Sequence, residues 1–153
     1  MNKKILVAYF SHSGNTEAVA NNIKETVGAD IFEIKTTESY PSEYNLVVDK
    51  AKKEQDTDYR PRLTAKVQDM DTYNFVFLGY PNWWGTMPMA VFTFLEEHDL
   101  SGKTIVPFCT HEGSGLSHSE KDVAQICPKA TLLKGLPIRG SRVSDAKKTL
   151  RTG

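Results

Sequence analysis

Apolar and polar residues follow one another along this chain in a regular succession of strand-length apolar runs and helical patterns. An apolar run over residues 4–10 predicts a first strand, and residues 15–27 carry apolar side chains at helical spacing, which predicts a helix. Gly28 directly follows that pattern and is typical of a helix end. Residues 31–34 alternate between apolar and polar side chains, which indicates a second strand at the edge of a sheet.

The same succession continues in the second half of the chain. A continuous apolar run over residues 75–78 predicts a strand that is buried on both faces, and residues 104–109 predict another strand. Pro88 is expected to open the helix between these two strands. A further helix is predicted over residues 117–127, with Ser117 as its N-cap.

The end of the chain departs from this simple alternation. The last strand is predicted in two pieces, residues 131–133 and residues 136–138, which lie on either side of Gly135. A short final helix is expected over residues 144–150.

Residues 36–72 form a long polar stretch between the second and third predicted strands. This stretch is predicted to hold a helix over residues 43–55, with Ser42 as its N-cap. Its mixed run of charges is typical of a solvated helix face.

Because strands and helices alternate, the chain is predicted to be an α/β protein with a parallel, doubly wound sheet. Residues 1–153 are expected to form a single domain, because this length is typical of one domain and no repeat or linker interrupts the pattern. Ligands of such sheets bind beyond the carboxyl ends of the strands. The loops after the first, third and fourth predicted strands are therefore the candidate site.

The loop after the first strand is rich in hydroxyl and amide groups and stands directly before a helix. Backbone N–H groups and the positive end of the helix dipole converge there and suit a phosphate. The loop contains no Lys or Arg, which excludes a Walker loop, and its spacing excludes a dinucleotide turn. The alternative is an ordinary capped turn. The candidates are Ser11, His12, Ser13, Gly14, Asn15 and Thr16, of which His12 is expected to shape the loop.

The loops after the third and fourth strands offer a different chemistry. One has two tryptophans, of which one is expected to fill the core beneath the loop and the other to stack on a flat heteroaromatic ring. Gly79 and Gly85 are expected to allow a close backbone approach. The candidates are Pro81, Asn82, Trp83, Trp84 and Gly85 in this loop, and Thr110, His111, Glu112, Gly113, Ser114 and Gly115 in the next. With the phosphate loop, they suit a phosphorylated planar heteroaromatic molecule.

Composition and charge give no support for several other functions. The chain has 19 basic and 19 acidic residues, and this net charge of zero gives no reason to expect nucleic acid or a membrane as partner. Cys109 and Cys127 are not in a CxxC motif, which favours reduced thiols and a cytoplasmic location. The four histidines lack metal-ligand spacing, so no metal site and no catalytic residue is expected. His98 and His118 are expected at the surface.

The loop motifs also resemble those of a known family. The chain reads Tyr-Pro-Asn-Trp-Trp-Gly-Thr-Met-Pro in one loop and Thr-His-Glu-Gly-Ser-Gly in the other. With these motifs it resembles the bacterial flavodoxin-like proteins over about residues 4–140. The resemblance implies a three-layer sandwich with a five-stranded parallel sheet in the order 2-1-3-4-5, and FMN as the cofactor. It assigns to FMN binding all the candidates named above except His12 and Glu112.

The resemblance further implies an electron-transfer protein whose flavin cycles between oxidised, semiquinone and hydroquinone states. Its partners would be redox proteins, a reductase and an acceptor, and it would be a monomer or a weak dimer. The alternative is an FMN-dependent NAD(P)H oxidoreductase of the quinone-reductase type. The small size of the chain favours the carrier, because it leaves little room for a second substrate domain.

Two departures from the family pattern bear on that choice. The chain is neutral, whereas many flavodoxins are acidic, so a less extreme potential is expected for the reduced flavin. No Tyr or Trp lies in residues 110–117, so one flavin face is expected to be covered by His111 alone or to be open. The polar stretch could instead lean over that face through Tyr40, Tyr44 or Arg60, although surface packing is the simpler interpretation for these residues.

Overall fold

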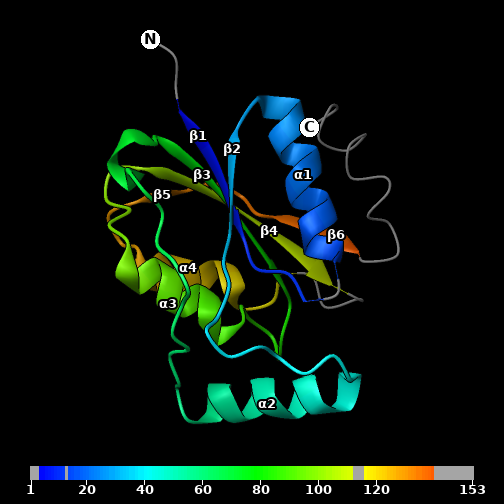
Figure 1. The fold of residues 1–153 in the computed structure, drawn as a ribbon. Helices are drawn as coiled ribbons and strands as arrows, with labels where there is room; N and C mark the ends of the chain where they lie inside the picture. The colour runs from blue at the N-terminus through cyan, green and yellow to red at the C-terminus, as the bar shows by residue number, and fades with distance from the viewer. Residues whose placement is uncertain (1–3, 13, 112–115, 140–153) are drawn as a thin grey trace.

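The computed structural model describes residues 4–12, 14–111 and 116–139 of the 153-residue chain (Figure 1). Strands and helices alternate along these residues, as the sequence pattern predicts. The elements are β1 Ile5–Tyr9, α1 Asn15–Val27, β2 Asp30–Glu33, α2 Tyr44–Asp56, a 3-10 turn at Met70–Thr72, β3 Phe75–Pro81, α3 Met89–Glu97, β4 Thr104–His111, α4 Ser119–Ile126, β5 Thr131–Leu132 and β6 Leu136–Arg139.

The strands form one parallel sheet in the order β2-β1-β3-β4-β5, with β6 also paired to β4. This order confirms the predicted topology, and β2 lies at the edge as its alternating pattern indicates. β5 and β6 are the two predicted pieces of the last strand. β5 pairs with the start of β4 and β6 with its end, and Gly135 between them donates its backbone N–H to Glu120 at 2.8 Å.

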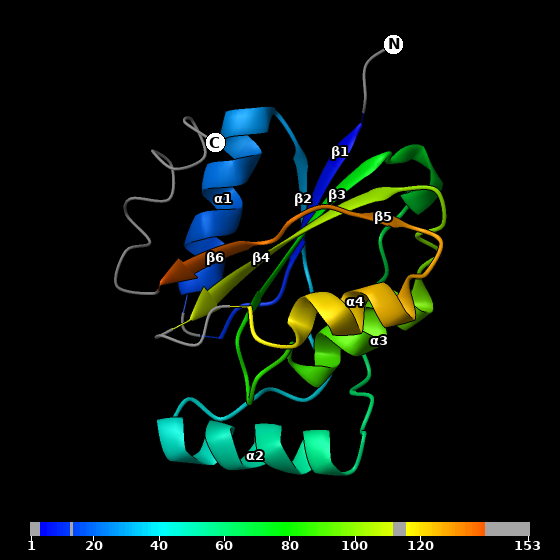
Figure 2. The ribbon, with the colours of Figure 1, turned by 180° about the vertical axis from the view of Figure 1, so that it is seen from behind.

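Helices cover both faces of this sheet, which gives the predicted three-layer sandwich (Figures 1 and 2). α1 packs Val19 and Ile23 against Val7 and Phe108 on one face. α3 and α4 cover the other face, where the larger part of the core lies. α1 ends as predicted at Gly28, which has a φ of 69° and donates its backbone N–H to the Lys24 carbonyl.

α2 does not lie on a face of the sheet. In both ribbon views it lies beyond the carboxyl ends of the strands, apart from the three layers (Figures 1 and 2). Its N-cap is Glu43 rather than the predicted Ser42. The position of this helix places it beside the loops that were predicted to hold a ligand.

The prediction that Ser117 caps the fourth helix is wrong, because α4 begins two residues later with His118 as its N-cap. Ser117 has a φ of 48°, and its hydroxyl oxygen instead accepts a hydrogen bond from the Asn82 amide. The short helix predicted over residues 144–150 lies outside the described residues. Among the described residues, no helix combines the length and the apolar character needed to cross a membrane.

Candidate functional site

The three candidate loops meet at one edge of the sheet. Tyr9 of β1 is paired with Gly79 of β3, and Pro81 at the end of β3 is paired with Thr110 of β4. The carboxyl ends of these three neighbouring strands therefore lie side by side, and the loops that follow them start from the same edge. The expectation drawn from the alternation of strands and helices is confirmed on this point.

The first loop presents the N-terminus of α1. Gly14 is the N-cap and has a φ of 95°, a left-handed conformation that favours glycine. The hydroxyl oxygen of Ser11 accepts hydrogen bonds from the backbone N–H groups of Gly14 and Glu17, both at 3.2 Å. Since a hydroxyl has two acceptor positions and one proton, Ser11 is left with its proton to offer to an anion. Ser13 lies outside the described residues.

Thr16 and Thr110 tie the first loop to the end of β4. Their hydroxyl groups share a hydrogen bond of 2.7 Å, and the side chains are 1% and 5% exposed. The sequence predicted both as cofactor contacts, and that role stays a prediction. What the structure adds is a buried link between two of the three loops, which fixes their separation.

The second loop is a tight turn with two residues in left-handed conformation. Trp83 and Thr86 exchange backbone hydrogen bonds, and Trp84 and Gly85 between them have φ values of 55° and 85°. This is the geometry of a type I′ turn, in which Asn and Gly are the usual central residues. The Asn82 side chain braces the turn, because its amide oxygen accepts the Gly85 N–H at 3.0 Å. A bulky Trp at the tip is costly for the backbone, so other contacts must hold it there.

The two tryptophans have different surroundings. Trp83 is half-buried in an aromatic cluster with Phe10, His12 and Tyr40, whose ring centroids lie 5.2–5.9 Å from its own at interplanar angles of 70–83°. It has the core-filling place expected for one tryptophan. Trp84 is 49% exposed. Contact between Trp84 and a ligand remains a prediction.

Trp84 is attached to α2. Its indole N–H donates to the Val48 carbonyl at 3.0 Å, and its own carbonyl accepts from the Gln55 amide at 3.2 Å. The Lys52 ammonium lies 5.3 Å from the centre of its ring. These contacts explain how the strained tip of the turn is held in place.

His12 makes a contact outside the first loop, and its expected role in shaping that loop stays a prediction. Its Nε2 donates to the Pro41 carbonyl at 2.7 Å. His111 ends β4 and is half-buried. The remaining candidates of the third loop, Glu112, Gly113, Ser114 and Gly115, lie outside the described residues, and their roles stay predictions.

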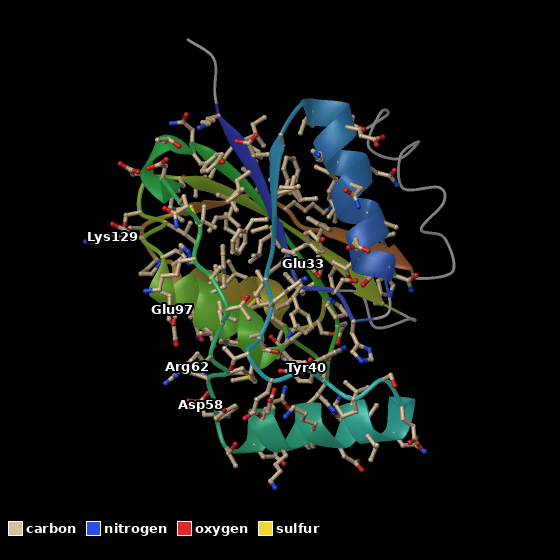
Figure 3. All side chains as sticks on the ribbon, in the orientation of Figure 1. Glu33, Tyr40, Asp58, Arg62, Glu97 and Lys129 are labelled. Carbon is tan, nitrogen blue, oxygen red and sulfur yellow. The ribbon has the colours of Figure 1, made fainter. Side chains whose placement is uncertain are left out.

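Tyr40, for which surface packing is the simpler interpretation of the sequence, is half-buried at this edge. It lies between α2 and the sheet (Figure 3), with its ring against Phe10 and Trp83. Its hydroxyl donates to the Glu54 carboxylate at 2.6 Å. Burial and the neighbouring Glu54 carboxylate raise the pKa of Tyr40, so its hydroxyl keeps its proton. No local pattern marks Tyr40, because its partners are far away in the sequence.

The Glu54 carboxylate is buried on α2, with only 7% of the residue exposed. Burial raises its pKa, while the Tyr40 hydrogen bond and the Lys50 charge act in the opposite direction and the Glu38 charge adds to the rise. The Lys50 ammonium lies 3.8 Å from Glu54 and 3.9 Å from Glu38. Glu54 is therefore a carboxylate whose charge depends on its two partners.

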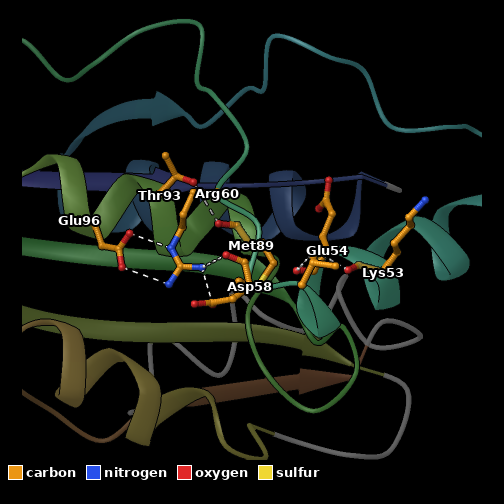
Figure 4. A network of polar contacts seen from close by, with 8 residues as sticks. Lys53, Glu54, Asp58, Arg60, Met89, Thr93 and Glu96 are labelled. Carbon is orange, nitrogen blue, oxygen red and sulfur yellow. Dashed lines mark hydrogen bonds and ion pairs between the residues drawn. The ribbon is translucent and has the colours of Figure 1, made fainter.

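Arg60 has the surface-packing role that the simpler interpretation gave it. Its guanidinium lies between Glu96 of α3 and Asp58, with hydrogen bonds of 2.7 Å to each (Figure 4). It also lies over the ring of Phe92. Arg60 anchors the chain that leaves α2 to α3.

Two further residues make contacts that the sequence does not predict. Gly79 allows a close approach, but of the Phe108 ring rather than of a ligand: a Cβ atom at Gly79 would overlap this ring. His98, which is expected at the surface, is half-buried and has a hydrogen-bond partner on each ring nitrogen. Its Nδ1 donates to the Phe94 carbonyl at 2.8 Å, and its Nε2 accepts the Val67 N–H at 3.0 Å.

Among the described residues, the cysteines and the potential metal ligands add no chemistry to this edge. Cys109 and Cys127 are reduced thiols. Burial raises the pKa of Cys109 to about 12 and that of Cys127 to about 11, so neither forms a thiolate at neutral pH. Across residues 4–12, 14–111 and 116–139, no cluster of His, Cys, Asp and Glu is arranged to hold a metal ion.

Comparison with known proteins gives a consistent family. A sequence profile described as flavodoxin matches residues 4–151. A protein from Bacteroides eggerthii DSM 20697, provisionally described as a flavoprotein, is 32% identical, with a TM-score of 0.82 over 98% of this chain and 99% of that one. A similarly described protein from Bacteroides uniformis ATCC 8492 is 29% identical, with a TM-score of 0.87 over 99% of both chains.

A more distant structure shares the fold. A flavoprotein from Lactobacillus acidophilus NCFM, solved in complex with FMN, is 20% identical and superimposes with a TM-score of 0.79 over 94% of this chain and 98% of that one. No curated protein matches the sequence.

Proposed function

We propose that this chain, which belongs to the flavodoxin family, binds FMN and acts as an electron-transfer protein between redox partner proteins. The observation that carries the proposal is the convergence of the α1 N-terminus and the tryptophan turn at one edge of the sheet. A cytoplasmic location and a monomeric or weakly dimeric state are part of the proposal. When bound, FMN would supply one- and two-electron transfer.

The first loop fits the phosphate of FMN. The α1 N-terminus offers backbone N–H groups, and the left-handed Gly14 leaves open space where a side chain would stand. The Ser11 hydroxyl and the Asn15 amide add polar groups at the same place. No cation stands in this loop, so the phosphate would be held rather than transferred.

The second loop fits the flat ring of FMN. Trp83 is fixed by three T-shaped ring contacts, and Trp84 presents a half-exposed indole at the tip of the turn. Aromatic rings of this kind stack on flat heteroaromatics. The Lactobacillus acidophilus flavoprotein that shares the fold was solved with FMN, which supports the same ligand here.

The residues that lie over this edge of the sheet support an electron carrier rather than an NAD(P)H oxidoreductase. The oxidoreductase needs a flavin face that is open to a hydride donor. Tyr40 stands beside Trp83, and α2 lies beyond the strand ends, so the edge has a cover that does not come from the third loop. Electrons can leave through a flavin edge without such an opening, which suits exchange with protein partners.

The test of FMN binding is a fluorescence titration of the flavin-free, full-length protein with FMN and with riboflavin. FMN is expected to bind more tightly, because riboflavin lacks the phosphate. The variant Asn15→Ala at the start of α1 is expected to weaken FMN binding about fivefold and to leave riboflavin binding unchanged. Asn22→Ala on the same helix is the matched control. Equal affinity for the two flavins, or no flavin binding, would refute the proposal.

An anaerobic titration of the FMN-loaded protein separates the carrier from the enzyme. The visible absorption of the flavin is followed while NADPH or NADH is added, and then dithionite. The carrier predicts bleaching by dithionite alone. Rapid bleaching by NADPH or NADH would mean that hydride reaches the flavin directly, and the oxidoreductase would replace the carrier.

A further inference from the structure

The segment over residues 41–56 bridges two of the loops that form the candidate site. At its start, the Pro41 carbonyl accepts the His12 ring N–H at 2.7 Å, which attaches it to the first loop. Along α2, the Val48 carbonyl and the Gln55 amide are both bonded to Trp84 of the second loop, at 3.0 and 3.2 Å. The segment therefore spans the two places where the phosphate and the ring of FMN are expected.

The attachment of α2 to the rest of the molecule is largely polar. Among the described side chains of α2, the buried apolar ones are Val47 and Ala51, whereas Leu46 is 52% exposed. By contrast, α3 buries a set of larger apolar side chains: Met89, Ala90, Val91, Phe94 and Leu95. Elements with few buried apolar contacts open at low free-energy cost. Individual hydrogen bonds therefore have a large influence on whether α2 stays in place.

The hydrogen bond from Tyr40 to Glu54 is a partly buried attachment of α2. The Tyr40 ring packs on Phe10 and Trp83, with centroids 5.6 and 5.2 Å apart, so it is fixed to the edge of the sheet. Its hydroxyl reaches the buried Glu54 carboxylate of α2 at 2.6 Å. The Lys50 ammonium, 3.8 Å from the other carboxylate oxygen, favours the ionised form. A hydroxyl that donates to a carboxylate makes one of the stronger hydrogen bonds in proteins.

We propose that Tyr40 and Glu54 are positioning residues that hold α2 closed over the flavin-binding edge, so that FMN enters and leaves only when α2 opens. This proposal rests on the proposed function. Gln55, through its bond to the Trp84 carbonyl, holds the second end of the same cover. The closed state is the one described here, in which the segment is bonded to both loops.

The proposal predicts a kinetic pattern that a simple contact does not produce. If the bond between Tyr40 and Glu54 is present in both the free and the loaded protein, its loss raises the open population of both by the same factor. Association and dissociation of FMN then both become faster, while the equilibrium constant barely changes. A net contribution typical of one hydrogen bond corresponds to about a fivefold change in each rate.

The experiment uses the full-length protein and the variant Tyr40→Phe, which removes the hydroxyl and keeps the ring. Stopped-flow flavin fluorescence gives the association and dissociation rates of FMN. Hydrogen exchange of the α2 backbone amides in the flavin-free protein gives the opening equilibrium independently. Gln55→Ala is the second variant. Tyr73→Phe is the matched control, because it removes a tyrosine hydroxyl that donates to the Asp30 carboxylate at 2.7 Å and makes no described contact with α2. Both test variants are expected to raise both rates and α2 exchange, and the control is expected to leave them unchanged.

The outcomes show whether the proposed role of α2 fails alone or together with the proposed function. Faster dissociation with an unchanged association rate would overturn the cover and make Tyr40 a contact of the bound flavin. Unchanged rates and unchanged α2 exchange in Tyr40→Phe and Gln55→Ala would overturn it as well, although wild-type FMN binding would still support the flavodoxin function. If the wild-type protein bound no FMN, both proposals would fail together.

Discussion

Gly79 provides a direct test of how tightly the sheet and its carboxyl edge are packed. It lies within β3, and its φ is not in the left-handed region, so the backbone itself would accept an alanine. A Cβ atom at this position would stand 2.8 Å from one carbon of the Phe108 ring and closer still to two others. Gly79→Ala therefore tests the side-chain space alone.

The expected cost follows from the surroundings of Phe108. The Phe108 ring projects from β4 and is fully buried in the core beneath α1. A rigid ring in a close-packed interior cannot move aside without displacing its neighbours. Overpacked substitutions cost about 1–3 kcal/mol, and the depth of this overlap places Gly79→Ala at the upper end, about 3 kcal/mol. Such a loss is a large share of the ~5–15 kcal/mol that stabilises a typical domain.

The assay is urea unfolding of the flavin-free protein, with the free energy of unfolding extrapolated to water. Phe108→Leu alone is expected to cost about 1–2 kcal/mol, because the smaller side chain leaves part of the space empty. In the double variant the smaller side chain makes room for the new methyl group, so the combined loss is expected to fall about 2 kcal/mol short of the sum. Strict additivity, or a loss below about 1 kcal/mol for Gly79→Ala alone, would refute the reasoning.

Two further predictions concern buried polar groups. Thr16→Val leaves the buried Thr110 hydroxyl without its described partner and is expected to lower the free energy of unfolding by about 1–3 kcal/mol in urea, whereas Thr16→Ser keeps the bond and most of the stability. Burial raises the pKa of Glu54, so the folded chain binds the carboxyl proton of Glu54 more tightly than the unfolded chain does. The stability that this protonated carboxyl contributes is therefore lost as pH rises through the range above the ordinary glutamate pKa. Thermal melts over a pH series are expected to show a shallower fall for Glu54→Gln, while Asp49→Asn at an exposed position of α2 keeps the wild-type slope; equal slopes in all three proteins would contradict this.

The sequence predicts the position of the candidate loops because that position follows from the order of elements alone. Once strands and helices alternate in a parallel sheet, the ends of neighbouring strands must meet at one edge. The pairing of Tyr9 with Gly79 and of Pro81 with Thr110 realises this rule. No side-chain detail is needed for that step, which explains its success.

The structural roles of individual residues do not follow from the local sequence, because they depend on partners far along the chain. Thr16 is bonded to a hydroxyl 94 positions away, and no local pattern indicates this pairing. A glycine at position 79 is compatible with the close approach of a ligand, but the Phe108 ring beside it also leaves no space for a side chain. The predictions of Ser42 and Ser117 as N-caps are wrong, because the residue types that cap helices also occur in ordinary turns. Ser117, with its φ of 48°, is an example.

The position of α2 illustrates the same limit and changes how the site is understood. The sequence predicts this helix within about one residue at each end, but its place beyond the sheet edge depends on His12, Trp84 and the ring of Tyr40. The expectation of an uncovered flavin face came from the third loop alone, which lacks a second large aromatic. Because Tyr40 supplies an aromatic ring beside Trp83 from a different segment, the absence in one loop does not imply an open edge. The question of access to the site therefore becomes a question about the stability of α2 in its closed position.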